Sequence, residues 1–238
     1  TGLGDLKGLE ILQKISRNLK IPVTTDVHTK EEVLTASKYV QMIQIPAFLC
    51  RQTEILTQSG KINNYINIKK GQFCSAQSVK YMIEKVKSQG NNKVIVTERG
   101  NSFGYQDLVV DIRNIPIMKS FGEKVVLDIT HSLQKPNQGF GVTGGTPEFI
   151  ETLACAGIAS KVDGIFLPKE TDFRLACALI NEVDFYVGPE GGFGHVAAAL
   201  NKKAVLYFGG WISPDVIGYD FHENIYYEDK QSPCGVKL

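Results

Sequence analysis

Apolar residues recur along the first two thirds of the chain with alternating helical and strand periods. Leu6, Leu9, Leu12 and Ile15 follow one another at helical spacing, which predicts an amphipathic helix over residues 5–19. Short runs of β-branched residues then alternate with helical stretches. The pattern predicts strands over residues 21–28, 42–46, 65–69, 93–97, 124–129 and 163–167, and helices over residues 30–38, 76–88, 106–113 and 146–156. This alternation favours parallel βαβ units, with the apolar strands covered on both faces.

Polar residues interrupt or end nearly every predicted strand. Gln44 lies inside an apolar strand, and the others are Asp26 and His28, Lys69, Glu98 and Arg99, and Asp128 and His131. Functional residues at the carboxyl ends of successive parallel strands are typical of a TIM barrel, whose active site is at that end. We therefore expect Asp26, Gln44, Lys69, Arg99 and His131 to converge at one mouth of a barrel of about six βα units.

Each of these residues also has a simpler explanation. Lys69 and Lys70 could form a solvated entry to a loop, and Arg99 could make a surface pair with Glu98, which would contribute little to stability. Against this, an arginine beside the glycine-rich loop that follows it suits a phosphate or a carboxylate. His131 could be a metal ligand, a general acid or base, or a hydrogen-bonded histidine at the barrel mouth.

Composition limits the possible classes. The 238 residues are 43% hydrophobic, enough for a full core, and the net charge of +1 gives no general argument for nucleic acid or a membrane surface. Five scattered cysteines without a C-x-x-C pair favour reduced thiols in a cytoplasmic protein. No apolar run reaches the length of a membrane span and no signal peptide is visible. The first residue is Thr1 and a helix follows almost at once, so we expect the chain to start within a longer protein.

Five motifs resemble one enzyme family in their order and spacing. They are TDVH at residues 25–28, IQIPAFLCRQ at 43–52, NIKKGQF at 67–73, ERGNSFGY at 98–105 with LVVD at 108–111, and DITHSLQ at 128–134. They are similar to the motifs of 3-deoxy-D-manno-octulosonate 8-phosphate synthases. The resemblance covers residues 1–167. It implies a TIM barrel, assembled in the family as a homotetramer, that condenses phosphoenolpyruvate with arabinose 5-phosphate for lipopolysaccharide biosynthesis.

The resemblance also implies roles for individual residues. Lys69 and Arg99 correspond to residues that hold phosphoenolpyruvate, and Arg51 to a phosphate-binding arginine near a subunit boundary. Gln44, Ala47, Phe48 and Gln134 would bind substrate, and Lys69, His131 and Asp26 would be the catalytic set. His131 matches the metal-ligating histidine of the metal-dependent class, so a divalent metal is an open expectation. Lysine and arginine suit the dianionic phosphate and the carboxylate of the substrates.

The chain departs from the family pattern at both ends. The family's first two strands, with two substrate lysines and the residue that separates the metal-free from the metal-dependent class, would precede Thr1. A metal-site glutamate of the family falls at Pro168. We therefore expect little synthase activity from this chain alone, because each lost charge-assisted contact to a buried anion costs roughly 1.5–3 kcal/mol.

Residues 168–238 resemble a different family. DFYVGPEGGFGHVAAAL at residues 184–200, AVLYFGG at 204–210 and SPCG at 232–235 are similar to the carboxyl-terminal domain of family-nine, heptosyltransferase-type glycosyltransferases of the GT-B fold. The resemblance implies a nucleotide-sugar site at Gly191, Gly192 and His195, where a strand, a glycine-rich turn and a helix N-terminus would cradle a diphosphate. The alternative is an ordinary glycine-rich βα turn.

Together these features predict an α/β chain: an incomplete TIM barrel over residues 1–167, followed by a small Rossmann-like βα segment over residues 168–238. The main functional prediction is the synthase reaction. The alternatives are a nucleotide-sugar glycosyltransferase of lipopolysaccharide assembly and a non-catalytic remnant that binds phosphorylated ligands. For the second segment, a separate lobe is favoured over insertion of its strands into the barrel, because barrel closure requires matched tilt and register.

Overall fold

A computed structural model describes residues 5–19, 21–102, 107–135, 144–166, 173–208 and 214–226. The chain divides into two compact units. The first contains residues 1–13 and 22–170, and the second contains residues 14–21 and 171–238.

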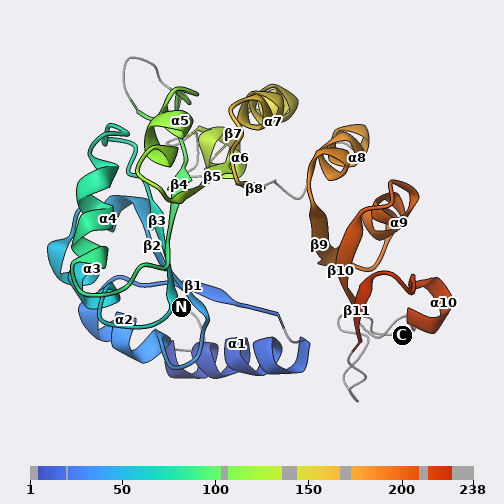
Figure 1. Ribbon diagram of the computed structural model, residues 1–238, viewed down its shortest axis with the longest axis horizontal. Helices are drawn as coiled ribbons and strands as arrows, with labels where there is room; N and C mark the ends of the chain where they lie inside the picture. The colour runs from blue at the N-terminus through green and yellow to red at the C-terminus, as the bar shows by residue number, and fades with distance from the viewer. Residues whose placement is uncertain are drawn as a thin grey trace. The chain divides into compact units, whose positions relative to one another are not determined.

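Six parallel strands form the sheet of the first unit (Figure 1). They are β1 (Thr24–Asp26), β2 (Met42–Ile45), β3 (Tyr65–Lys69), β4 (Val94–Glu98), β5 (Lys124–Asp128) and β8 (Gly164–Phe166), and they pair in the order β1-β2-β3-β4-β5-β8. The order of these six strands in the sheet is also their order along the chain, as in an incomplete TIM barrel. The six predicted strands and their parallel direction are therefore confirmed.

The strands are preceded or connected by helices, most of which lie outside the curved sheet (Figure 1). They are α1 (Asp5–Leu19), α2 (Lys30–Ala36), η1 (Ala47–Leu49), α3 (Thr53–Ser59), α4 (Val79–Lys87), α5 (Asn114–Lys119), α6 (Ile129–Ser132), η3 (Pro147–Phe149) and α7 (Ile150–Ala159). The start of α2 illustrates how the sequence sets these ends. The Thr29 hydroxyl accepts the amide of Glu32, and the Glu32 carboxylate accepts the amide of His28, so two otherwise unpaired donors are satisfied.

Alternation along the strands separates two faces of the sheet. Ile43, Ile66, Val96 and Leu127 are fully buried on the face that the helices cover. The residues that alternate with them point to the opposite, inner face. The polar residues Gln44, Asn67, Lys69, Thr97 and Asp128 belong to this inner set. The register places Asp26, Gln44 and Asn67 side by side across three strands.

The predicted helix over residues 106–113 is wrong. The described residues 107–113 are not helical, and the helix of this region is α5, which begins at Asn114. Val109 instead forms an antiparallel bridge with Asn101, in which each residue donates its amide to the other's carbonyl at 2.8 Å. A second short antiparallel pair joins β6 (Gln134–Lys135) to β7 (Gly144–Gly145).

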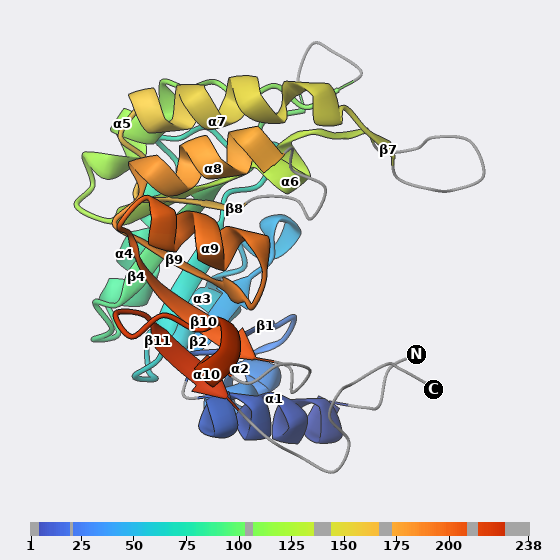
Figure 2. The same cartoon turned by 90° about the vertical axis from the view of Figure 1, so that its right-hand side faces the viewer.

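The second unit contains a three-stranded parallel sheet in the order β11-β10-β9 (Figure 2). Its elements are α8 (Phe173–Glu182), β9 (Phe185–Pro189), α9 (Gly192–Ala199), β10 (Lys203–Phe208), α10 (Pro214–Ile217) and β11 (Glu223–Tyr226). Ile180, Ala197, Ala204, Leu206 and Phe208 form its buried core. The predicted strand–turn–helix at residues 184–200 is confirmed, whereas β11 was not predicted.

Among the described residues, the strands of each unit pair only within their own unit. β10 pairs with β9 and β11, and β1 pairs with β2. How the second segment attaches to the first therefore stays a prediction. No helix among the described residues is long and apolar enough to cross a membrane.

Candidate functional site

Three ionisable side chains meet where β3 and β5 end. The Lys69 Nζ lies 2.8 Å from the Asp128 carboxylate, and the Nδ1 of His131 lies 2.7 Å from the same Oδ2. Since an ionised carboxylate can only accept, the Nδ1 of His131 donates to it, and Nε2 is the ring nitrogen that remains for another group. Lys69 is 8% exposed and Asp128 is 2% exposed, whereas the His131 side chain is 40% exposed. The imidazole is therefore the member of this group that solvent or a ligand reaches most easily.

The charge of Asp128 depends on its two partners. Burial by itself raises the pKa of this carboxyl group, but hydrogen bonds from His131 and Lys69 outweigh burial and hold the pKa at about 2. The backbone amide of His131 adds a third hydrogen bond, at 3.0 Å, because Asp128 caps helix α6. Asp128 therefore stays ionised at neutral pH and fixes the positions of both Lys69 and His131.

Arg99 follows β4 and joins the same site. Its Nη2 donates to the backbone carbonyl of His131 at 3.3 Å and to the Gln134 side chain at 3.4 Å. Burial lowers the pKa of the guanidinium, although the nearby Asp128 and Glu98 carboxylates oppose this. The Nε of Arg99 is buried and has no hydrogen-bond partner among the residues that the structure describes. The site thus brings Lys69, Arg99, His131 and Gln134 together and leaves one cationic group incompletely satisfied.

A row of hydrogen bonds crosses the inner face of the sheet beside this cluster. The Thr97 hydroxyl donates to the Asn67 side chain at 2.8 Å, and Asn67 donates to Gln44 at 2.9 Å. Gln44 in turn donates to the Asp26 carboxylate at 2.6 Å. The row runs from β4 to β1 with every donor directed toward Asp26. It brings the predicted residues Asp26 and Gln44 together, and Lys69 lies opposite Thr97 in the register.

The remaining predicted residues lie on and after η1. Ala47 is 5% exposed, and its carbonyl oxygen lies so close to Gly71 that a side chain at Gly71 would meet it at 2.9 Å. The segment after β2 therefore packs against the segment that follows Lys69. Phe48 is 71% exposed and Arg51 is also exposed, and within the described residues no hydrogen bond or ion pair joins either of them to Lys69 or Arg99.

A buried ion pair was missed by the sequence reasoning. Lys70 and Glu98 have fully buried side chains and lie 3.2 Å apart, so neither of the two surface explanations for these dipeptides holds. Asn101 and Asn114 contact the pair. The alternation of side chains along a strand could have identified this pair. Lys70 lies two residues after the buried Ile68, and Glu98 lies two residues after the buried Val96, so both side chains fall on the apolar, helix-covered face.

The described residues do not supply a metal site. No group of three or more histidine, cysteine, aspartate or glutamate side chains lies close enough to hold an ion in this part of the chain. The Nδ1 of His131 is held by Asp128, so only its Nε2 could bind an ion, and one ring nitrogen is too few donors for a site. The donor set does not fit a divalent metal, and we assign no step to one.

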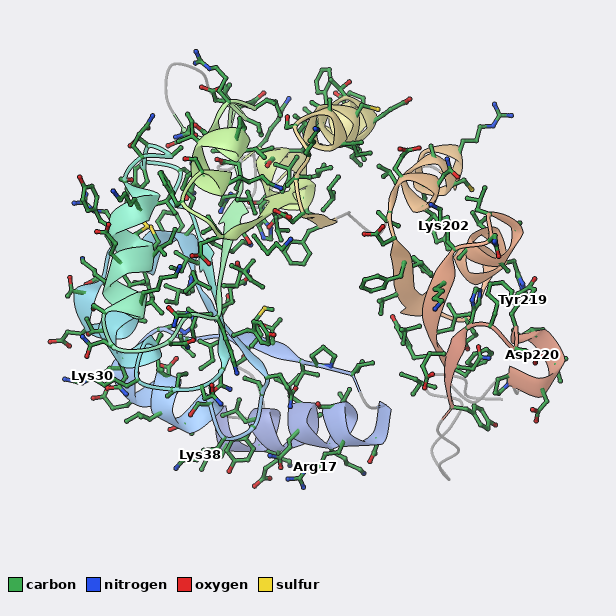
Figure 3. The ribbon with its side chains drawn as sticks, in the orientation of Figure 1. Arg17, Lys30, Lys38, Lys202, Tyr219 and Asp220 are labelled. Carbon is green, nitrogen blue, oxygen red and sulfur yellow. The ribbon has the colours of Figure 1, made fainter. Side chains whose placement is uncertain are left out.

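In the second unit, Gly191 separates β9 from α9 in a conformation that favours glycine, with φ of +138°. Gly192 begins the helix. The exposed His195 lies in its first turn, with Nδ1 2.9 Å from the hydroxyl of Tyr219, which is labelled in Figure 3. These three predicted residues therefore share one strand–turn–helix segment.

Known proteins resemble this chain over the first unit. Residues 1–172 match the DAHP synthetase I family. A 2-dehydro-3-deoxyphosphooctonate aldolase of Trichlorobacter lovleyi is 45% identical over 178 residues, which are 75% of this chain and 65% of the relative. Proteins of the same name from Geobacter sulfurreducens and Koribacter versatilis are 45% and 46% identical over 72% of the chain. The chain spans less than two thirds of the length of these relatives.

The family match and the geometry concern the same residues. All six strands of the first sheet and the whole cluster around Lys69, Arg99 and His131 lie within the matched residues 1–172. The chain belongs to the DAHP synthetase I family.

Proposed function

We propose that the first unit carries the phosphoenolpyruvate site of a 3-deoxy-D-manno-octulosonate 8-phosphate synthase, which condenses phosphoenolpyruvate with arabinose 5-phosphate. The family match and the relatives named 2-dehydro-3-deoxyphosphooctonate aldolase support this reaction. The observation that carries the proposal is the presence of Lys69 and Arg99 at the ends of neighbouring strands, where the Arg99 Nε is buried and has no partner within the described part of the chain. An unpaired buried donor is costly, and an anionic ligand would satisfy it.

The charge balance of the site supports an anion. Lys69 and Arg99 contribute two positive charges and Asp128 contributes one negative charge, so these three residues carry a surplus of one positive charge, with Asp26 at the β1 end of the hydrogen-bonded row left out of this sum. The Glu98 charge is compensated by Lys70 on the other face of the sheet. A phosphate or a carboxylate would complete this balance, and phosphoenolpyruvate has both.

We assign the roles as follows. Lys69 and Arg99 bind phosphoenolpyruvate, and Gln44, Ala47, Phe48 and Gln134 line its pocket. Asp26 and His131 act on the reacting groups, His131 through its free Nε2, which can accept a proton from a substrate hydroxyl or from water. Arg51 binds the phosphate of a substrate. In a tetramer like that of the family, Arg51 would lie close to a neighbouring subunit.

Calorimetric titration of the full chain with phosphoenolpyruvate tests this proposal. Lys69→Ala and Arg99→Ala should each weaken binding by about tenfold or more, because each removes a charge-assisted contact. Lys80→Ala is the matched control, since Lys80 forms an exposed pair with Glu84 on α4. Unchanged affinity in both site variants would contradict the assignment. Binding without condensation after arabinose 5-phosphate is added would instead favour the non-catalytic remnant.

A second candidate function concerns residues 168–238, which we propose as a separate glycosyltransferase-like segment. The glycine-rich turn between β9 and α9, with Gly191, Gly192 and His195 in sequence, supports a site for the diphosphate of a nucleotide-sugar. Titration with UDP-glucose and ADP-glucose tests it. Affinity that falls in His195→Ala but not in Arg99→Ala would support the candidate, and the absence of binding by the native chain would remove it.

A further inference from the structure

Two buried charges lie directly behind the two cations of the proposed site. Lys70 directly follows Lys69, the last residue of β3, and its amide still donates to the carbonyl of Thr97 on β4 at 2.8 Å, whereas Glu98 is the last residue of β4 and Arg99 follows it. Because successive side chains of a strand point to opposite faces, Lys70 and Glu98 lie on the helix-covered face of the sheet. Neither side chain is exposed, and the Nζ of Lys70 lies 3.2 Å from the Oε1 of Glu98.

Glu98 holds the backbone of the turn that follows β4. Its Oε1 accepts the amide of Arg99 at 2.9 Å and the amide of Gly100 at 2.7 Å. Its Oε2 accepts the Asn114 side chain at the start of α5 at 3.1 Å. Gly100 adopts φ of +88°, a conformation that favours glycine. One carboxylate therefore fixes the direction in which the chain leaves the strand at Arg99.

Lys70 extends this fixation to the segment after β3. Its Nζ lies 3.1 Å from the Asn101 side chain and 3.4 Å from the carbonyl oxygens of Gly71, Cys74 and Gly100. The ammonium thus joins the segment after Lys69 to the segment after Arg99.

We propose that Lys70 and Glu98 are positioning residues that set the direction and the separation of Lys69 and Arg99. This inference rests on the proposed function for its link to phosphoenolpyruvate. The pair touches no substrate and adds no net charge, so the surplus positive charge of the site stays with Lys69 and Arg99. A single substitution would leave an unpaired buried charge, which is strongly destabilising, so the two positions are best changed together.

The first test measures the turn itself and needs no ligand. In the Lys70→Met/Glu98→Leu variant, the amides of Arg99 and Gly100 lose their acceptor, and their hydrogen exchange measured by NMR should accelerate by about tenfold or more. The Lys70→Met/Glu98→Gln variant keeps a neutral acceptor and should restore most of the protection. If the Lys70→Met/Glu98→Leu variant does not fold, the Lys70→Met/Glu98→Gln variant tests the proposal alone. A neutral acceptor holds the amides of Arg99 and Gly100 more weakly than the carboxylate does, so these amides should still exchange about threefold faster than in the native chain.

The matched control is Lys87→Met/Glu123→Gln. Lys87 ends α4 and Glu123 precedes β5, so this pair joins the opposite ends of the strands, and the Glu123 side chain is also buried. Exchange at Arg99 and Gly100 should not change in this variant. Unchanged exchange at both amides in folded Lys70/Glu98 variants would overturn the proposal, as would equal acceleration in the control.

The second test links the turn to ligand binding. If the native chain binds phosphoenolpyruvate, the Lys70→Met/Glu98→Leu variant should bind it at least about tenfold more weakly, with the glutamine variant in between and the control unchanged. Equal affinity in all variants would overturn the link. If the native chain does not bind phosphoenolpyruvate, the proposed function fails while the exchange experiment still decides whether the pair positions Arg99.

Discussion

At the scale of single residues, Asp128 connects the charge of the site to the stability of the fold. Its pKa of about 2 in the folded chain lies below the ordinary value of 3.8. A depressed pKa stabilises the fold above the ordinary pKa, and this contribution disappears as the pH falls through the folded value. The difference corresponds to roughly 2 kcal/mol at neutral pH, and the 3% exposure of the side chain means that solvent screens it little.

Asp128→Asn should therefore lower the free energy of unfolding by about 2 kcal/mol at pH 7, with a smaller difference from the native chain between pH 4 and pH 2. Urea titrations of both proteins across this range check the expectation. Glu84→Gln is the control, since Glu84 forms an exposed pair with Lys80 on α4 and such pairs contribute little. A difference for Asp128→Asn that stays constant from pH 7 to pH 3 would contradict the assigned pKa.

The sequence was sufficient to find Lys69 and Arg99 but not the pair behind them. A polar residue at the end of an apolar strand is visible in a single stretch of sequence. The burial of Lys70 depends on Glu98, 28 positions later, and on the register between β3 and β4. Two successive lysines are usually a surface feature, so local pattern favoured the wrong environment for Lys70.

At the scale of elements, strands were predicted better than the segments between them. Strands covered on both faces have a continuous apolar pattern that few other structures share. The segment over residues 107–113 has the apolar residues Leu108, Val109 and Val110, which resembled a helix face. The pairing of Val109 with Asn101 is a contact between two segments, and helical periodicity within one window cannot reveal it.

Helix packing in the first unit depends on one glycine. Gly60 caps α3, and a side chain at this position would overlap the backbone carbonyl oxygen of Val86 in α4. Gly60→Ala should lower the free energy of unfolding by about 1–3 kcal/mol, because two backbones must separate. Gly8→Ala is the matched control: nothing lies within 4 Å of the added methyl group on α1, and alanine favours helix by about 1 kcal/mol. Thermal unfolding of both variants checks the prediction, and equal effects would refute it.

At the scale of the whole molecule, the six-stranded and the three-stranded sheet share no strand pairing among the described residues. The family match ends at residue 172, close to the division between the compact units after residue 170. The number and the order of the strands in the first sheet could be predicted, because each strand pairs with the strands that precede and follow it in the chain order of the six. The lobe formed by β9, β10 and β11 could be predicted only as the more favourable of two arrangements.

A chain ending at residue 170 should therefore keep the six-stranded sheet. Its amide resonances for β2 to β5 should coincide with those of the full chain, because their partners lie within residues 22–170. The helix α1 is excluded from this comparison, since its second half groups with residues 171–238. Collapse of the resonances of β3 and β4 in the shortened chain would show that the two units fold together.

The directed hydrogen bonds from Thr97 to Asp26 restrict how this protein can vary over evolution. Asn67 and Gln44 each present an oxygen to one neighbour and a nitrogen to the other. A mutation of Gln44 to glutamate would place two carboxylates in contact, and a mutation of Asp26 to asparagine would weaken the end that all donors approach. Substitutions at these positions are therefore expected to arise as linked changes, in which one replacement is retained only after another has restored the direction of the row.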